Sequence, residues 1–152
     1  MLRTRLRESL TVAMKAKDER SVSTLRLILA AVKDRDISAR AKGNMDGISD
    51  EEILGLLQSM IKQRHESITL YKQGGRQDLV DQETQEIAVI QKFLPQQMQA
   101  DEMTDAIGKV IAELEAKSLK DMGRTMAALK ERYAGRMDFA KASALVKQKL
   151  AS

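Results

Sequence analysis

The sequence lacks cysteine and tryptophan, and its 152 residues include one histidine and one proline. Without cysteine the chain can form no disulfide, no thiolate nucleophile and no zinc–cysteine site. The one histidine, His65, has cationic neighbours in Lys62 and Arg64, so we expect it on the surface and predict no metal site. Ser67 has no base nearby except His65, which faces another side of a helix, so we predict no catalytic residues.

Aromatic residues and long apolar runs are also scarce. Aromatics make up 3% of the chain, against nine methionines, so the core must be built from aliphatic and thioether side chains. No apolar run approaches the roughly 18 residues of a membrane span, and residues 1–10 lack the apolar core of a secretory signal. The glycines form no P-loop and no dinucleotide fingerprint. We therefore expect a cytoplasmic protein with no membrane association and no cofactor.

Charge is abundant and unevenly distributed. Residues 1–42 contain eleven basic and five acidic residues, a net charge of +6, and residues 117–152 contain nine and three, again +6. The segments 43–99 and 100–116 each carry a net charge of −4. Cationic ends suit a phosphate-rich partner, but ordinary solvated basic faces explain them equally well.

Apolar residues recur every three or four positions in four segments before Pro95, which is typical of amphipathic helices. Ser49 and Glu52 form a capping box that starts the third helix at Asp50, and the Gly74–Gly75 pair ends that helix. The expected helices cover residues 2–14, residues 22 to about 41, residues 50–73 and residues 79–94.

The polar stretch 95–100 separates these helices from three shorter ones. The later helices cover about residues 103–114, 119–133 and 139–150, with Ser118 and Asp138 as caps and Gly135 as a stop. No segment alternates as a strand does. The sequence thus predicts an all-α protein with an N-terminal four-helix domain, residues 1–95, and a C-terminal three-helix bundle, residues 96–152.

Four motifs resemble those of the YqeY family: TLRLILAAVKD (24–34), IKQRHESITLY (61–71), ETQEIAVIQKFLP (83–95) and DMGRTMAALKERYAGRMD (121–138). The resemblance spans nearly the whole chain. It implies a small bacterial, all-helical, two-part protein whose C-terminal region is similar to the tail of GatB, a subunit of the tRNA-dependent amidotransferase. That tail is regarded as a tRNA-contacting appendage, and the catalytic machinery of GatB lies in parts absent here. A carbon–nitrogen ligase label would follow from domain similarity alone.

Basic side chains lie off the apolar stripe of the second domain or in its Gly135 turn. With the resemblance, they predict a tRNA-binding surface made of Lys120, Gly123, Arg124, Lys130, Arg132, Arg136 and Lys141. We prefer Arg136 as the anchor, because a turn between helices can add free backbone N–H groups. The scarcity of aromatics predicts recognition by shape and phosphate. The alternative is a solvated, lysine-rich face.

Gly123 stands inside a predicted helix, where glycine costs about 1 kcal/mol relative to alanine. We expect another backbone to pass close to it, and the alternative is the direct approach of a ligand phosphate. In the first domain, Arg64 falls on or beside the apolar stripe and requires a carboxylate, which Glu83 and Glu86 can supply. We expect this polar cluster to fix the register of two helices. A functional pocket is the alternative.

Together these features favour a non-catalytic tRNA-binding adaptor of aminoacyl-tRNA metabolism. The implied partners are tRNA and an aminoacyl-tRNA synthetase or an amidotransferase subunit. One alternative is an accessory factor or component of a glutamine-dependent tRNA amidotransferase, a carbon–nitrogen ligase with glutamine as amido donor. Another is a protein–protein adaptor that binds no RNA.

Overall fold

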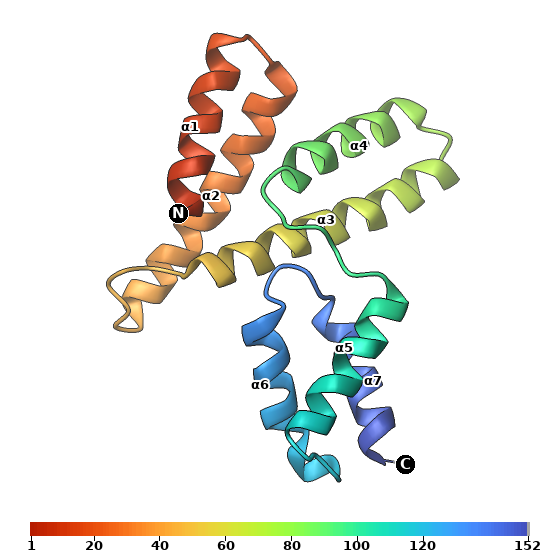
Figure 1. Ribbon diagram of the computed structural model, residues 1–152. Helices are drawn as coiled ribbons and strands as arrows, with labels where there is room; N and C mark the ends of the chain where they lie inside the picture. The colour runs from red at the N-terminus through yellow and green to blue at the C-terminus, as the bar shows by residue number, and fades with distance from the viewer. Residues whose placement is uncertain (152) are drawn as a thin grey trace. The chain divides into compact units, whose positions relative to one another are not determined.

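The computed structural model describes residues 1–151, and all regular secondary structure in that range is helical (Figure 1). The predicted all-α class is therefore confirmed. Contacts between residues divide the chain into two compact units: unit 1, Met1–Pro95, and unit 2, which begins at Gln96. None of the helices in residues 1–151 combines the length and the apolar character needed to cross a membrane.

Unit 1 contains α1 (Leu2–Lys15), α2 (Glu19–Ala41), α3 (Asp50–Gln73) and α4 (Gln77–Gln91). Helices α1 and α2 form one hairpin, α3 and α4 form a second, and α2 also packs on α4 (Figure 1). The predicted capping box of Ser49 and Glu52 is present at the start of α3. Helix α4 ends earlier than expected, because residues 92–94 already form a turn ahead of Pro95.

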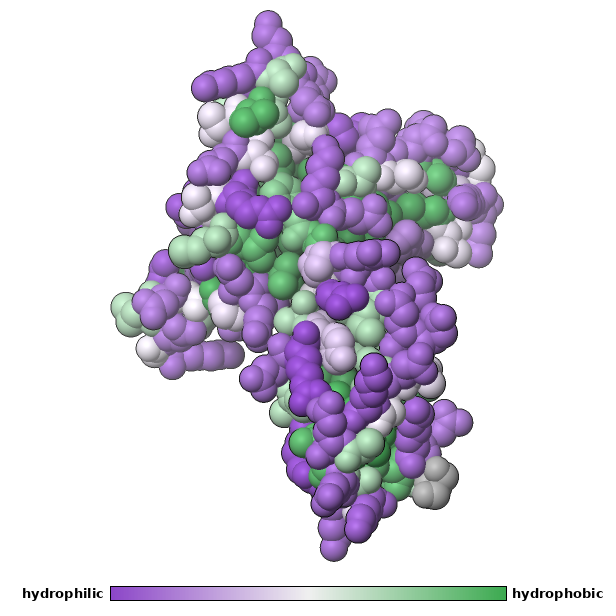
Figure 2. Space-filling model, in the orientation of Figure 1, coloured by the Kyte–Doolittle hydropathy of each residue, from purple (hydrophilic) through white to green (hydrophobic). Residues whose placement is uncertain are grey.

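The core of unit 1 comes from the apolar stripes of all four helices. Its completely buried members include Leu6, Ile28, Ile53, Leu57 and Ile90. Burying such aliphatic side chains contributes roughly 1.5–3 kcal/mol each, so the stripes decide which helix faces turn inward. Hydrophilic side chains cover most of the face seen in Figure 2, although hydrophobic ones remain visible over the α1–α2 hairpin.

Unit 2 contains α5 (Ala100–Glu113), the 3₁₀ turn η1 (Leu119–Asp121), α6 (Met122–Arg132) and α7 (Phe139–Ala151). The predicted sixth helix is thus split, since its first turn is 3₁₀ and leaves Leu119 50% exposed. Asp138 caps α7 as expected, because its Oδ1 accepts hydrogen bonds from the backbone N–H groups of Ala140 and Lys141. Helices α5, α6 and α7 contact one another around a core that includes Ile107, Val110, Leu129, Met137 and Val146.

Candidate functional site

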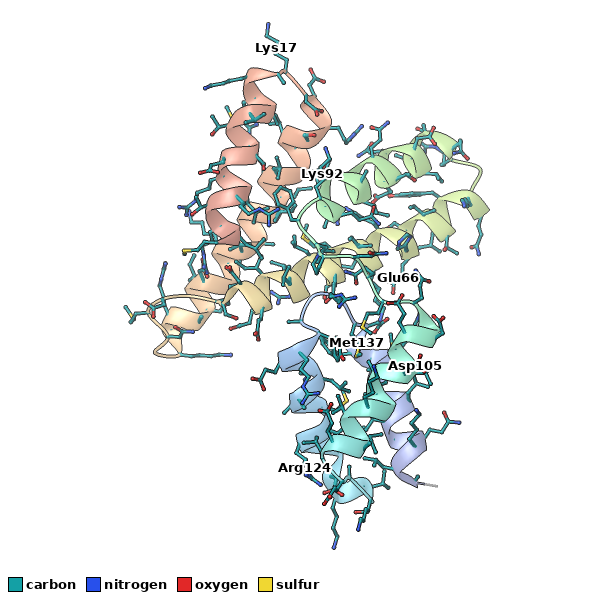
Figure 3. The ribbon with its side chains drawn as sticks, viewed as in Figure 1. Lys17, Glu66, Lys92, Asp105, Arg124 and Met137 are labelled. Atoms are coloured by element: carbon teal, nitrogen blue, oxygen red, sulfur yellow. The ribbon has the colours of Figure 1, made fainter. Side chains whose placement is uncertain are left out.

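The solvent side of η1 and α6 carries four of the seven predicted tRNA-binding residues. Lys120, Gly123, Arg124 and Lys130 are all exposed, whereas Thr125 and Leu129 on the opposite side of α6 are completely buried. Residues three and four apart are neighbours on a helix surface, so Lys120 adjoins Gly123 and Arg124. Figure 3 shows Arg124 near the end of unit 2 where η1 leads into α6.

Gly123 does not serve the packing role that we expected. A Cβ atom added at Gly123 would meet no atom of any other segment within 4 Å, so no neighbouring backbone requires glycine there. The expectation is wrong because Gly123 lies on the solvent side of α6, away from the buried stripe. The missing side chain therefore leaves a patch of α6 backbone open to an approaching ligand.

Two of the arginines form ion pairs within unit 2. Arg124 Nε lies 3.0 Å from Asp121 Oδ1, and Arg132 Nη1 lies 2.6 Å from Glu113 Oε2. Hydrogen bonds from the backbone N–H of Lys117 and from the Arg124 side chain lower the pKa of Asp121. Exposed pairs of this kind contribute little to stability, so a phosphate can replace the carboxylate at small cost.

Arg136 holds the turn before α7 to the start of unit 2. Its Nε donates to the carbonyl oxygen of Gln96 at 3.1 Å, and its own carbonyl accepts from the N–H of Met98 at 2.9 Å. Gly135 is buried with a φ of 77° in the left-handed region, and its carbonyl accepts from Gln97 Nε2 at 2.5 Å.

The backbone of this turn also differs from our expectation of free N–H groups. The N–H groups of Arg136 and Met137 both donate to the carbonyl of Tyr133. These two N–H groups are therefore not available to a phosphate. The Nε of Arg136 thus stabilises this turn against the start of unit 2, and its role as the anchor for tRNA stays a prediction.

The lysines of the predicted surface are unpaired. Lys120, Lys130 and Lys141 are exposed, and none has a carboxylate within 4.0 Å among residues 1–151. Lys120 is three residues before Gly123, Lys130 is about two helical turns after it, and Lys141 lies in the first turn of α7. These lysines supply free positive charge to unit 2.

In unit 1 the structure brings Arg64, Glu83 and Glu86 together. Arg64 Nε lies 3.2 Å from Glu86 Oε2 and 4.0 Å from Glu83 Oε2, and a guanidinium nitrogen of Arg64 donates to the carbonyl of Met60 at 3.1 Å. All three side chains are at most 16% exposed. Burial and the neighbouring charge of Glu86 raise the pKa of Glu83, and Arg64 partly offsets them. The cluster joins α3 to α4.

Unit 1 also contains a second polar cluster, which the sequence analysis did not predict. The carboxylate of Asp36 on α2 accepts hydrogen bonds from the side chain of Arg3 on α1 and from the N–H of Ile48 at 2.8 Å. Arg3 also donates to the carbonyl of Ile48 at 2.7 Å. The hydrogen bond from Arg3, followed by that from Ile48, outweighs burial and lowers the pKa of Asp36. The sequence did contain a sign of this cluster, because Asp36 continues the buried stripe of α2 one turn after Val32.

No group of His, Cys, Asp and Glu within residues 1–151 is arranged to hold a metal ion. His65 is exposed on α3. Ser67 lies on the same helix, in its last two turns, and is half-buried.

Comparison with known proteins gives one family over most of the chain. A family model described as Yqey-like protein matches residues 3–150. The relatives found include three yeast proteins named altered inheritance of mitochondria protein 41, mitochondrial. The one from Vanderwaltozyma polyspora is 36% identical over 90 residues, 59% of this chain and 46% of that protein. The one from Eremothecium gossypii is 36% identical over 89 residues, with coverages of 59% and 46%.

The third relative, from Saccharomyces cerevisiae strain YJM789, is 33% identical over 92 residues, 60% of this chain and 47% of that protein. The matched region is thus a little less than half the length of each of these relatives.

Proposed function

Because the chain belongs to the YqeY family, we propose that it is a non-catalytic tRNA-binding adaptor of aminoacyl-tRNA metabolism. The observation that supports the proposal is the solvent side of η1 and α6, where Gly123 leaves the backbone open and the exposed Lys120 and Lys130 have no carboxylate partner within residues 1–151. Phosphate contacts of this kind position a nucleic acid without reading its bases. The resemblance of residues 121–138 to the tail of GatB favours tRNA as the nucleic acid that binds.

In this proposal residues 1–95 form a four-helix domain that supports the second domain or binds a protein. Residues 96–152 form a three-helix domain that contacts tRNA. We propose a cytoplasmic location in a bacterium, whereas the names of the yeast relatives place those proteins in mitochondria. The expected protein partner is an aminoacyl-tRNA synthetase or an amidotransferase subunit.

Titration of total tRNA against the full chain at several salt concentrations tests the proposal. Each lysine that neutralises a phosphate releases a counterion, so affinity should fall steeply as salt rises. In the double variant Lys120→Glu, Lys130→Glu, we expect the Kd to rise by about tenfold or more and the salt dependence to become shallower. The charge-matched control is Lys62→Glu, Lys72→Glu, which changes two exposed lysines of α3.

Equal weakening by both pairs of substitutions would remove the η1–α6 surface from consideration. An absence of tRNA binding by the unaltered chain would favour the protein–protein adaptor, and capture of partners from lysate with and without ribonuclease separates these two functions. The amidotransferase alternative rests on the resemblance to GatB. A glutamine-dependent transamidation assay with and without this protein tests it.

A further inference from the structure

Unit 1 contains an open cleft of about 560 Å³ that no residue of the proposed tRNA surface lines. Its walls come from α1, from the start of α2 and from the end of α4. The floor is apolar, with Ala13, Leu25, Val89 and Phe93 each at most 7% exposed. Clefts that bind small molecules commonly have volumes of 300–1,000 Å³ and a mostly apolar lining with a few polar groups.

Arg5 provides a positioned cation at this cleft. Its guanidinium carbon lies 5.6 Å from the centre of the Phe93 ring. A guanidinium over an aromatic face is attracted by the ring and is held there without using its N–H groups. The Arg5 side chain has no hydrogen bond and no ion pair with any residue in the range 1–151, and only its backbone N–H donates, to the carbonyl of Met1. Its planar set of donors therefore remains available to a carboxylate.

The remaining charges of the lining disfavour a ligand with several negative charges. Lys92, at the end of α4, also lines the cleft, and Figure 3 shows it where α4 faces the α1–α2 hairpin. Two acids, Glu8 and Asp18, line the same cleft. The Asp18 carboxylate is engaged by Ser21, whose hydroxyl donates at 2.7 Å and whose backbone N–H donates at 3.2 Å. These acids repel a polyanion such as RNA, whereas one carboxylate can reach Arg5.

We propose that this cleft binds a small molecule with one carboxylate on an apolar body. The apolar part packs on the floor that Leu25 and Val89 provide, and the carboxylate accepts hydrogen bonds from Arg5, with Lys92 as the second cation. All residues of this site belong to unit 1, and none of them is part of the proposed tRNA surface.

Octanoate is a suitable probe because it has one carboxylate and a flexible apolar chain. We expect it to produce saturable shifts in the amide NMR signals of cleft residues in the full chain. Octan-1-ol, which keeps the chain and loses the charge, should bind about tenfold more weakly, and inorganic phosphate should cause no saturable shifts there. Ala16→Leu, which adds bulk to the lining of the cleft, should abolish binding of both octanoate and octanol.

Arg5→Gln should raise the Kd for octanoate by about tenfold and leave that for octanol within twofold. Arg7→Gln is the matched control, because Arg7 is an exposed arginine of the same helix that does not line the cleft. Lys92→Gln gives a second variant if Arg5→Gln alters the spectrum of unit 1 as a whole. The proposal is overturned if octanoate causes no saturable shifts, if octanol binds as tightly, or if the Arg5 and Arg7 variants behave alike.

Discussion

The ion pairs that join helices in unit 1 have side chains exposed by 8–20%, and the ion pairs of unit 2 have side chains exposed by 24–54%. In each helical hairpin of unit 1 a half-buried arginine joins the two helices through an ion pair: Arg3 joins α1 to α2, and Arg64 joins α3 to α4. In unit 2, Arg124 and Arg132 pair at the surface. A buried charge is strongly destabilising without its partner, so the pairs of unit 1 constrain which helices meet. The charges of unit 2 remain accessible to a ligand.

The largest expected effect comes from Asp36→Ala. This change leaves the Arg3 side chain and the Ile48 N–H without their acceptor, and should reduce the free energy of unfolding of unit 1 by about 3 kcal/mol. Urea denaturation followed by circular dichroism gives the free energy, and amide hydrogen exchange assigns the loss to residues 1–95. Asp34→Ala, at an exposed site of α2, is the control. A difference below about 1 kcal/mol between the two variants would contradict the importance of this cluster.

Gly47→Ala tests the same cluster from the backbone side. Gly47 has a φ of +81°, and an added Cβ would collide with the Asp36 carboxyl group and crowd Arg3. Gly43→Ala is a matched control, because Gly43 has a φ of +98° and no atom within 4 Å of an added Cβ. We expect a loss of about 1 kcal/mol for Gly43→Ala from backbone strain and about 2 kcal/mol for Gly47→Ala. Equal losses would mean that the carboxyl group moves aside freely.

Glu83→Gln should change the free energy of unfolding by less than these substitutions. At neutral pH it should increase that free energy. Burial, reinforced by the charge of Glu86, raises the pKa of Glu83 in the folded state. The folded state therefore favours the protonated form of Glu83. The contribution of Glu83 to stability is fully present below the unfolded pKa, about 4.3, and is lost as pH rises through the folded pKa. The variant should therefore be the more stable protein at pH 7 and lose this advantage near pH 4.

Stability measured across that pH range, with Glu66→Gln at an exposed site of α3 as the control, tests the prediction. Parallel pH profiles for the unaltered chain and Glu83→Gln would show that Glu83 titrates as an ordinary surface carboxyl.

The smallest expected effect is that of Arg132→Ala. Its ion pair with Glu113 joins α6 to α5 but is 44% and 54% exposed, so solvent already screens most of the attraction. We expect the midpoint of urea denaturation to remain unchanged within the error of measurement. A loss of stability comparable to that of Asp36→Ala would show that the ion pairs of unit 2 matter as much for stability as those of unit 1.

Much of the local structure could be predicted from the sequence. The capping box at Ser49, the cap at Asp138 and the stop at Gly74 depend on groups within about four residues of one another. The pairing of Arg64 with Glu83 and Glu86 was also expected, because all three fall on or beside apolar stripes. Which cations of unit 2 stay unpaired could not be predicted, since that depends on where Glu113 and Asp121 lie in space.

The sequence by itself determined the helical periods, most helix ends and the concentration of positive charge at both ends of the chain, because these properties are local or additive. Only the tertiary structure decided that Asp36 meets Arg3, 33 positions away, and that Gly47 must leave room for their contact. It also decided that Gly123 is open and that Arg136 is held by Gln96. The reason is physical: hydrogen-bond partners and solvent exposure depend on which distant segments pack together, and residue spacing along one helix does not specify that.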